Sequence, residues 1–305
     1  MMKSILHIFV LTLLSSGLSC SQEAGNPPSA KEQDKPYKNE EFNAYWYSGK
    51  AEVAAYNLKQ SRYGEIHDGK AVLIFVTEPF SKSKQVKLDN PEQARDDKIT
   101  VMKLNFTKKF TTGIYPYSMM LSSFTPVDSY NHSKTLKVTM SSQEWCGQVY
   151  SQMNLDRRKY SLKSFSYFEK EGDQDLSIEA ALLEDELWNQ IRLNYKALPV
   201  GEIKIIPGLF HTRLMHKNLK PVLATATLNE EGGQITYQVK YPERSLSITF
   251  DKVFPYQIQS WEETYNGIGG KELTTSATLD KTLHIDYWSK NSVSDKYLRD
   301  SLNLK

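Results

Sequence analysis

Cysteine is scarce in this sequence. The 305 residues contain two cysteines, Cys20 and Cys146. Two thiols cannot build the disulfide framework of a small secreted domain, and they cannot supply a cysteine-rich zinc site. If Cys20 has another role, as argued below, Cys146 has no partner. A single cysteine of this kind is more often a small buried apolar residue than a nucleophile.

The sequence also lacks the short motifs that carry catalysis or cofactor binding. It has no HExxH, no paired CxxC, no GxSxG elbow, and no Walker A or GxGxxG loop. Its six histidines are scattered, without the spacing of metal ligands. We therefore expect no metal, no cofactor and no enzymatic activity. A hydrolase built from residues distant in sequence is a less favoured alternative.

Neither sign of charge is in excess. The chain has 38 lysines and arginines against 36 acidic residues, a formal net charge of +2. It has no basic stripe interleaved with aromatic residues. Since nucleic-acid binding depends on concentrated positive charge, we expect no nucleic-acid partner.

No apolar run in the sequence is long enough to span a membrane. The longest run, residues 5–14, is followed by a small, flexible stretch and Cys20; a membrane-spanning helix needs about 20 apolar residues. This layout is typical of an export signal at residues 1–19. Its end resembles the lipobox of bacterial lipoproteins, although Gly17 stands where leucine is usual. The resemblance implies that Cys20 is lipidated; the alternative is an ordinary secretory signal followed by a chance cysteine.

The segment after the signal is polar. Residues 20–41 are rich in charged residues, glycine and proline, and almost nothing in them can pack. We predict that this segment is a lipid-anchored, disordered tether. Residues 42–305 then form a single β-rich domain.

Short runs of apolar, β-branched and aromatic residues dominate that domain. The run 70–78 is apolar on both faces, which predicts a central strand. After residue 201, turn signals recur at intervals of about ten to twelve residues, as in antiparallel meanders, sandwiches and barrels. We predict a mainly β fold with a large antiparallel curved sheet, a half-barrel or a sandwich, and one mid-chain helix.

Several local predictions accompany this fold. The mid-chain helix is expected within residues 176–194, and a short terminal helix at 294–302. Residues 209–216 are predicted to be a strand, and Asp68-Gly69 and Asp280-Lys281 to be turns. The helical prediction rests on an apolar stripe at near-helical spacing: Ala180, Leu183, Leu187 and Ile191.

Four residues are candidates for contact with a ligand or a partner. Glu144, Trp145 and Cys146 place an acid, an aromatic ring and a thiol at consecutive positions of an expected strand. Trp261 begins a second stretch in which acids and aromatic residues alternate. A cysteine nucleophile needs a neighbouring base, and no histidine is close to Cys146 in sequence, so catalysis there is disfavoured.

Five stretches carry a likeness to a known family: Tyr63–His67, Lys70–Glu78, Ser141–Gly147, Leu182–Trp188 and Ile258–Thr264. They resemble a family of uncharacterised Gram-negative lipoproteins often labelled septum formation inhibitor Maf. The pyrophosphatases of that name carry a Ser-x-Ser-Pro-Arg-Arg motif. Here the one Arg-Arg pair, Arg157-Arg158, has no Ser-Pro before it. The resemblance therefore implies an exported lipoprotein and supplies no catalytic residues.

These features together predict a lipid-anchored protein of the cell envelope, an outer-membrane lipoprotein that faces the periplasm or the cell surface. We expect a non-enzymatic binding or carrier module whose aromatic-lined concave side takes an apolar or amphiphilic ligand. The alternative is a structural or assembly lipoprotein that docks other envelope proteins. In that case the polar loop at residues 81–98 is a contact site.

Overall fold

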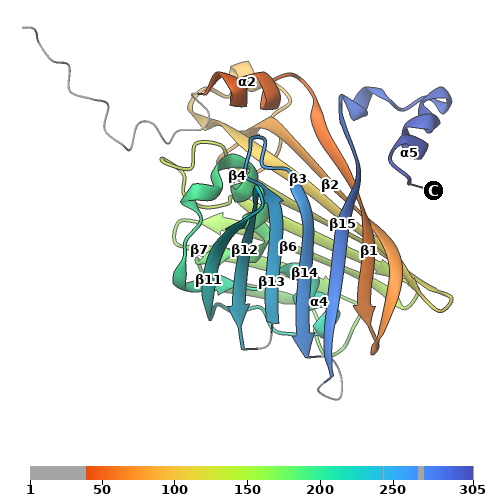
Figure 1. Cartoon of the computed structure of the whole chain (residues 1–305). Coiled ribbons are helices and arrows are strands. Elements are labelled where there is room, and N and C mark those ends of the chain that lie inside the picture. Colours follow the sequence, from red (N-terminus) through yellow and green to blue (C-terminus); the bar gives the residue numbers. More distant parts are fainter. Residues whose placement is uncertain (1–38, 243, 267–270, 305) are drawn as a thin grey trace, which may run out of the picture. The chain divides into compact units, whose positions relative to one another are not determined.

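The computed structural model describes residues 39–242, 244–266 and 271–304. Fifteen strands in these ranges form one sheet, in the order β8-β7-β6-β5-β4-β3-β2-β1-β15-β14-β13-β12-β11-β10-β9. All neighbours are antiparallel except β9 and β10, which are parallel. The chain thus starts in the middle of the sheet, runs outward to β8, crosses to the opposite edge at β9 and returns to β15, beside β1 (Figure 1).

The first eight strands are β1 (Ala51–Arg62), β2 (Glu65–Ser81), β3 (Lys98–Thr112), β4 (Tyr115–Pro126), β5 (Lys137–Glu144), β6 (Gly147–Asp156), β7 (Lys159–Ser166) and β8 (Gln174–Glu179). The others are β9 (Leu182–Leu183), β10 (Gly201–Ile206), β11 (Val222–Glu231), β12 (Gln234–Tyr241), β13 (Arg244–Asp251), β14 (Ile258–Asn266) and β15 (Glu272–Ile285). The α-helices are α2 (Glu40–Trp46), α3 (Leu187–Asn194), α4 (Leu209–Met215) and α5 (Tyr297–Ser301). Short 3₁₀ turns are η2 (Pro91–Gln93), η3 (Arg95–Asp97), η4 (Glu184–Glu186), η5 (Tyr195–Ala197), η7 (Tyr287–Ser289) and η8 (Val293–Lys296).

The mainly β prediction is confirmed, and the sheet is curved and unclosed. Its two ends come close together, because Lys204 on β10 pairs with Glu179 on β8 at 2.5 Å. Figure 1 shows β11 to β15 and β1 passing across β3, β4, β6 and β7, so that the two halves of the sheet face each other. The predicted central position of the 70–78 run is also confirmed, because it lies in β2, between β1 and β3.

The inner face of the sheet is filled by helices α3 and α4. The ring of Trp188 on α3 lies 5.1 Å from that of Phe106 on β3 and 5.3 Å from that of Trp261 on β14. Phe210 on α4 contacts the same Phe106 ring, at 5.3 Å. These edge-to-face contacts join both halves of the sheet through one aromatic cluster. The concave side is therefore a packed core around the two helices.

Helix α3 is also fixed by polar contacts. The Asn189 side chain donates to the backbone carbonyl of Met102 at 3.1 Å and to the Thr125 hydroxyl at 2.9 Å. The Arg192 guanidinium makes two hydrogen bonds to the carboxylate of Glu52 on β1, at 2.7 and 2.5 Å. These buried bonds set the position of α3 against β3, β4 and β1.

The mid-chain helix is shorter than predicted. The apolar stripe is helical only from Leu187 onward, whereas residues 174–179 form the edge strand β8, which pairs with β7. Most of β8 is exposed. An edge strand with so few buried residues has no alternating apolar pattern, so its pairing with β7 was not visible in the sequence.

The predicted strand at residues 209–216 is wrong. Residues 209–215 form helix α4, and His216 is its left-handed C-cap. The fold thus has a second helix beside α3. Six of the seven residues of α4 are buried. A helix buried nearly all round shows no periodicity that distinguishes it from a buried strand. Its start is fixed by a distant residue, because the Leu209 N–H donates to the Asp185 carboxylate at 3.0 Å.

Two of the predicted turns are also wrong, whereas the terminal helix is confirmed. Asp68 and Gly69 lie within β2, and the β1–β2 turn falls at Tyr63-Gly64. Asp280 is the extra residue of a β-bulge, since Ala55 pairs with Lys281 and the next residue of β1 pairs with Leu279. The terminal helix is present as η8 and α5. No helix in the described ranges is long and apolar enough to cross a membrane.

Candidate functional site

A chain of buried ion pairs lies beneath helix α4. Lys108 on β3 contacts Glu263 on β14 at 2.5 Å, and Glu263 contacts Arg244 at 3.1 Å. Arg244 in turn contacts Glu184 at 2.6 Å. Burial alone would raise the pKa of Glu263, but Lys108 and Arg244 outweigh it and lower this pKa to about 2. Each charge in this chain therefore has a partner, as buried charges require.

The remaining acids of the 184–186 segment have structural partners. Glu186 accepts hydrogen bonds from the backbone N–H groups of Thr135 and Leu183, at 3.0 and 3.1 Å. Asp185 accepts the Leu209 N–H described above. Burial raises the pKa of Asp185 to about 8, against the lowering effect of that hydrogen bond. A Cβ added to Gly208 would lie 2.7 Å from Glu184 Oε1, so glycine permits this close approach of α4.

His211 on α4 differs from these groups because its imidazole makes no hydrogen bond with a described residue and its ring nitrogens stay accessible to solvent. Only 6% of the residue is exposed. Its ring lies 5.8 Å from that of Tyr265. Burial lowers the pKa of His211 to about 3, and Arg244 adds to the effect. The side chain is thus neutral at physiological pH and offers one N–H donor and one lone pair.

His211 lines a cavity of about 660 Å³, which we name the α4 cavity. The wall is mainly apolar, and two of its described lining residues, Lys217 and Lys220, are basic. Leu223 on the wall is 78% exposed. The lining residues are Pro207, His211, Thr212, Lys217, Asn218, Lys220, Pro221, Val222, Leu223, Tyr241 and Pro242. This size lies within the usual range of small-molecule sites, roughly 300–1,000 Å³.

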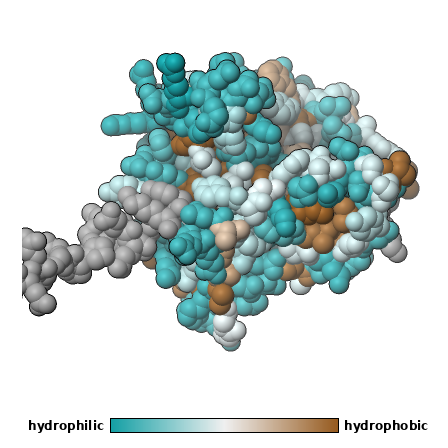
Figure 2. Space-filling model, turned by 90° about the horizontal axis from the view of Figure 1, so that it is seen from above, coloured by the Kyte–Doolittle hydropathy of each residue, from teal (hydrophilic) through white to brown (hydrophobic). Residues whose placement is uncertain are grey.

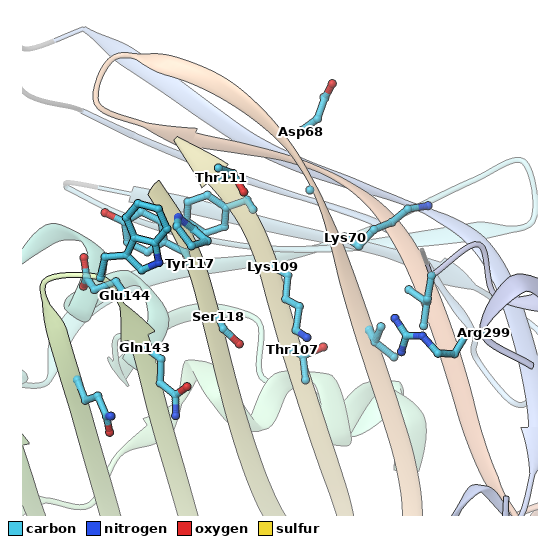
Figure 3. Close-up of a pocket in the computed structure, with 17 residues that line it drawn as sticks. Asp68, Lys70, Thr107, Lys109, Thr111, Tyr117, Ser118, Gln143, Glu144 and Arg299 are labelled. Atoms are coloured by element: carbon cyan, nitrogen blue, oxygen red, sulfur yellow. The ribbon is translucent and has the colours of Figure 1, made fainter. Parts of the chain in front are cut away.

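A second hollow, of about 950 Å³, lies on the outer face of the sheet, and we name it the outer groove (Figure 3). Two of the predicted contact residues, Glu144 and Trp145, line it. Glu144 ends β5, whereas Trp145 and Cys146 form the β5–β6 turn instead of continuing a strand. Trp261 lies in the interior, 1% exposed. Cys20 lies outside the described residues.

The expectation that Cys146 is a small buried residue is wrong, because the β5–β6 turn places it at the surface. It is exposed, and its backbone N–H donates to the Tyr115 hydroxyl at 2.7 Å. No group of three or more histidine, cysteine or acidic side chains in the described ranges is arranged to hold a metal ion.

No pattern in the sequence singled out His211, Lys220 or Leu223 as site residues. His211 and Leu223 were predicted to lie in two separate strands, whereas in the structure His211 lies on α4 and both residues line one cavity. Seen from the end that carries α2, the surface is mostly hydrophilic, with separate hydrophobic patches (Figure 2).

Comparison of the chain with known protein families, curated proteins and solved structures found no match.

Proposed function

We propose that this chain is a non-enzymatic binding module whose ligand is an anionic amphiphile held in the α4 cavity. The observation that carries the proposal is the imidazole of His211, which lines a largely apolar cavity and makes no hydrogen bond with a described residue. A ligand oxygen in the cavity could accept a hydrogen bond from the His211 N–H.

The rim and the wall of the α4 cavity favour different parts of such a ligand. Lys220 lines the cavity and brings positive charge to it. Lys220 forms no ion pair within the described ranges. The three prolines, Val222 and Leu223 offer an apolar surface to a hydrocarbon chain or ring. The arrangement therefore suits a single negative charge attached to an apolar body.

The centre of the concave side is occupied by α3 and α4, so we place the ligand beside α4 and not between the two halves of the sheet. Among the described residues, Glu184, Asp185 and Glu263 are engaged in the ion pairs and helix contacts described above. His211 offers a free imidazole, but the neighbouring Thr212 hydroxyl is engaged, since it donates to the Leu209 carbonyl at 3.2 Å. This supports binding without chemistry, because nucleophilic catalysis needs a free nucleophile next to the base.

We further propose that the module is anchored at the outer membrane through lipid on Cys20. The proposal rests on the leader pattern, since residues 1–38 lie outside the described ranges. A tether of some twenty residues would let the folded body reach up to roughly 65–70 Å from the membrane surface. An amphiphile-binding module on such a tether could meet ligands that leave or enter the membrane.

Displacement of a bound fluorescent fatty acid from the purified full-length chain tests the binding proposal. We expect dodecanoate to displace it about tenfold better than dodecyl maltoside, which is neutral, or dodecyltrimethylammonium, which is cationic; tenfold corresponds to about 1.4 kcal/mol. Lys220→Glu and Leu223→Glu should each weaken dodecanoate binding at least about tenfold, because each places a negative charge at the cavity.

Val293→Glu is the matched control, because Val293 is 80% exposed, nearly as much as Leu223, and lies outside the cavity. It should bind dodecanoate as the unchanged chain does. Equal displacement by the three detergents, or variants at Lys220 and Leu223 that bind normally, would overturn the proposal, as would failure of the fluorescent fatty acid to bind.

A further inference from the structure

The outer groove is built on strands β2 to β6, on the face opposite to the packed core. Strand pairing places its floor residues side by side. Lys70 pairs with Lys109, Lys109 with Ser118, Ser118 with Gln143, and Gln143 with Gln148. Five successive strands therefore contribute one row of polar side chains.

This row sets the length of the groove. Neighbouring strands lie about 4.8 Å apart, so four steps from β2 to β6 span roughly 19 Å. Arg299 and Leu304 of the C-terminal segment line the groove at the β2 end, and Trp145 lines it from the β5–β6 turn. Figure 3 shows Arg299 on the side of Lys70, and Gln143 and Glu144 toward the other side. The floor of the groove thus runs across five strands.

The two ends of the groove differ in charge. Lys109 and Arg299 are exposed and make no ion pair within the described ranges. The two acids that line the groove are already paired: Asp68 with Lys59 at 2.5 Å, and Glu144 with Arg213. Lys70 is matched by Asp280 at 3.0 Å. Two positive charges therefore remain for a ligand, both near the β2–β3 end.

The other end presents an aromatic ring on a fixed turn. Trp145 is 66% exposed. The Tyr115 hydroxyl accepts the Cys146 N–H at 2.7 Å and donates to the Glu144 carboxylate at 3.1 Å, so both sides of the turn are held. Gly147 follows without a side chain; a Cβ there would lie 2.5 Å from the ring of Tyr167. An exposed indole held in this way is a stacking surface, because little entropy is lost when a flat ring packs on it.

From these features we infer that the outer groove binds an anionic oligosaccharide, with its carboxylate near Lys109 and Arg299 and a sugar ring against Trp145. The floor between the two ends carries a hydroxyl and two primary amides, from Ser118, Gln143 and Gln148. Such groups both donate and accept hydrogen bonds, as the hydroxyl groups of a sugar chain require. This inference is independent of the α4 cavity and its ligand.

The same features disfavour single-stranded nucleic acid. Recognition of a single strand depends on an aromatic ring for each stacked base. The outer groove offers one exposed indole. A sugar chain instead needs hydrogen-bond partners for its hydroxyls along its length, and the amide row supplies them.

Isothermal titration of the full-length chain with tetragalacturonate, cellotetraose and a short oligothymidylate tests the inference. We expect tetragalacturonate to bind at least about tenfold more tightly than the neutral cellotetraose, since two unpaired cations face its carboxylates. Lys109→Gln should weaken this binding about three- to tenfold and reduce its sensitivity to salt. Trp145→Ala should weaken the binding of both sugars by a similar factor, because stacking does not depend on charge.

Two exposed residues outside the groove provide matched controls. Lys163→Gln removes a lysine from the neighbouring strand β7, and Trp288→Ala removes a tryptophan that is 50% exposed; both should bind tetragalacturonate normally. Leu223→Glu should also leave sugar binding intact, and Lys109→Gln should leave dodecanoate binding intact. The proposals for the α4 cavity and for the outer groove can therefore be rejected independently of each other. Absence of tetragalacturonate binding, equal binding of the two sugars, or tighter binding of the oligothymidylate would overturn the inference.

Discussion

Arg192→Met is expected to lower the free energy of unfolding by about 3–5 kcal/mol, because it leaves the Glu52 carboxylate buried without its counter-ion. Both side chains of this pair are fully buried. After the substitution, the Tyr45 hydroxyl, at 2.6 Å, would be the one remaining donor recorded at that carboxylate. Urea unfolding followed by tryptophan fluorescence would measure the loss.

The double variant Glu52→Leu with Arg192→Met separates the cost of the unpaired charge from the value of the pair. Replacement of both partners of a buried pair by apolar residues is often neutral or stabilising, and we expect the double variant to recover most of the loss. Lys59→Gln is the control, because Lys59 and Asp68 form an exposed pair at 2.5 Å; its effect should stay below about 1 kcal/mol. A single variant at Arg192 as mild as this control would contradict the expectation.

This buried pair also shows why the strands of the sheet could be predicted from the sequence, whereas the contacts inside the fold could not. Alternation along single strands, as on β13, is a local property and predicted most of the sheet. The pairing of Glu52 with Arg192 joins residues 140 positions apart. Nothing in either local pattern indicates the other partner, so the position of α3 could not be derived from the sequence alone.

Helix α4 was missed for a similar reason. It is buried on most sides, although its sequence mixes apolar and polar residues, and its start depends on Asp185 and on the absence of a side chain at Gly208. Because the α4 cavity exists only when residues 209–215 are helical, its histidine could not be recognised as a site residue. The outer groove depends on the register of five strands. Two of its lining residues, Glu144 and Trp145, were singled out from their chemistry, but Lys109 and Arg299 were not.

Asp185 and His211 are expected to give the stability of the protein opposite dependences on pH. The pKa of Asp185 rises from 3.8 to about 8 on folding, so its contribution to stability is full below pH 4 and is lost as the pH rises to 8. The pKa of His211 falls from 6.5 to about 3, so its contribution is full above pH 6.5 and is lost as the pH falls to 3. Between about pH 4 and 6.5 the two slopes oppose each other.

Asp185→Asn should therefore gain stability relative to the unchanged chain as the pH rises from 4 to 8, by up to roughly 5 kcal/mol if the whole difference in pKa is expressed. The asparagine side-chain oxygen can still accept the Leu209 N–H, so the start of α4 is kept. His211→Asn should show the reverse trend, with a relative gain as the pH falls from 6.5 to 3. Urea unfolding at half-unit steps from pH 4 to 8.5 measures both differences.

This test depends on how the free energy of unfolding changes with pH and not on its absolute value. Any loss of packing at either position lowers the free energy of unfolding by an amount that does not change with pH. It therefore displaces the plot of stability against pH without changing its slope. Glu230→Gln is the control, because Glu230 is exposed and paired with Lys252 at the surface; its difference curve should be nearly flat across the same range. If the Asp185→Asn curve is equally flat, Asp185 is ionised in the folded protein near neutral pH, and the buried charges beneath α4 must compensate for its burial.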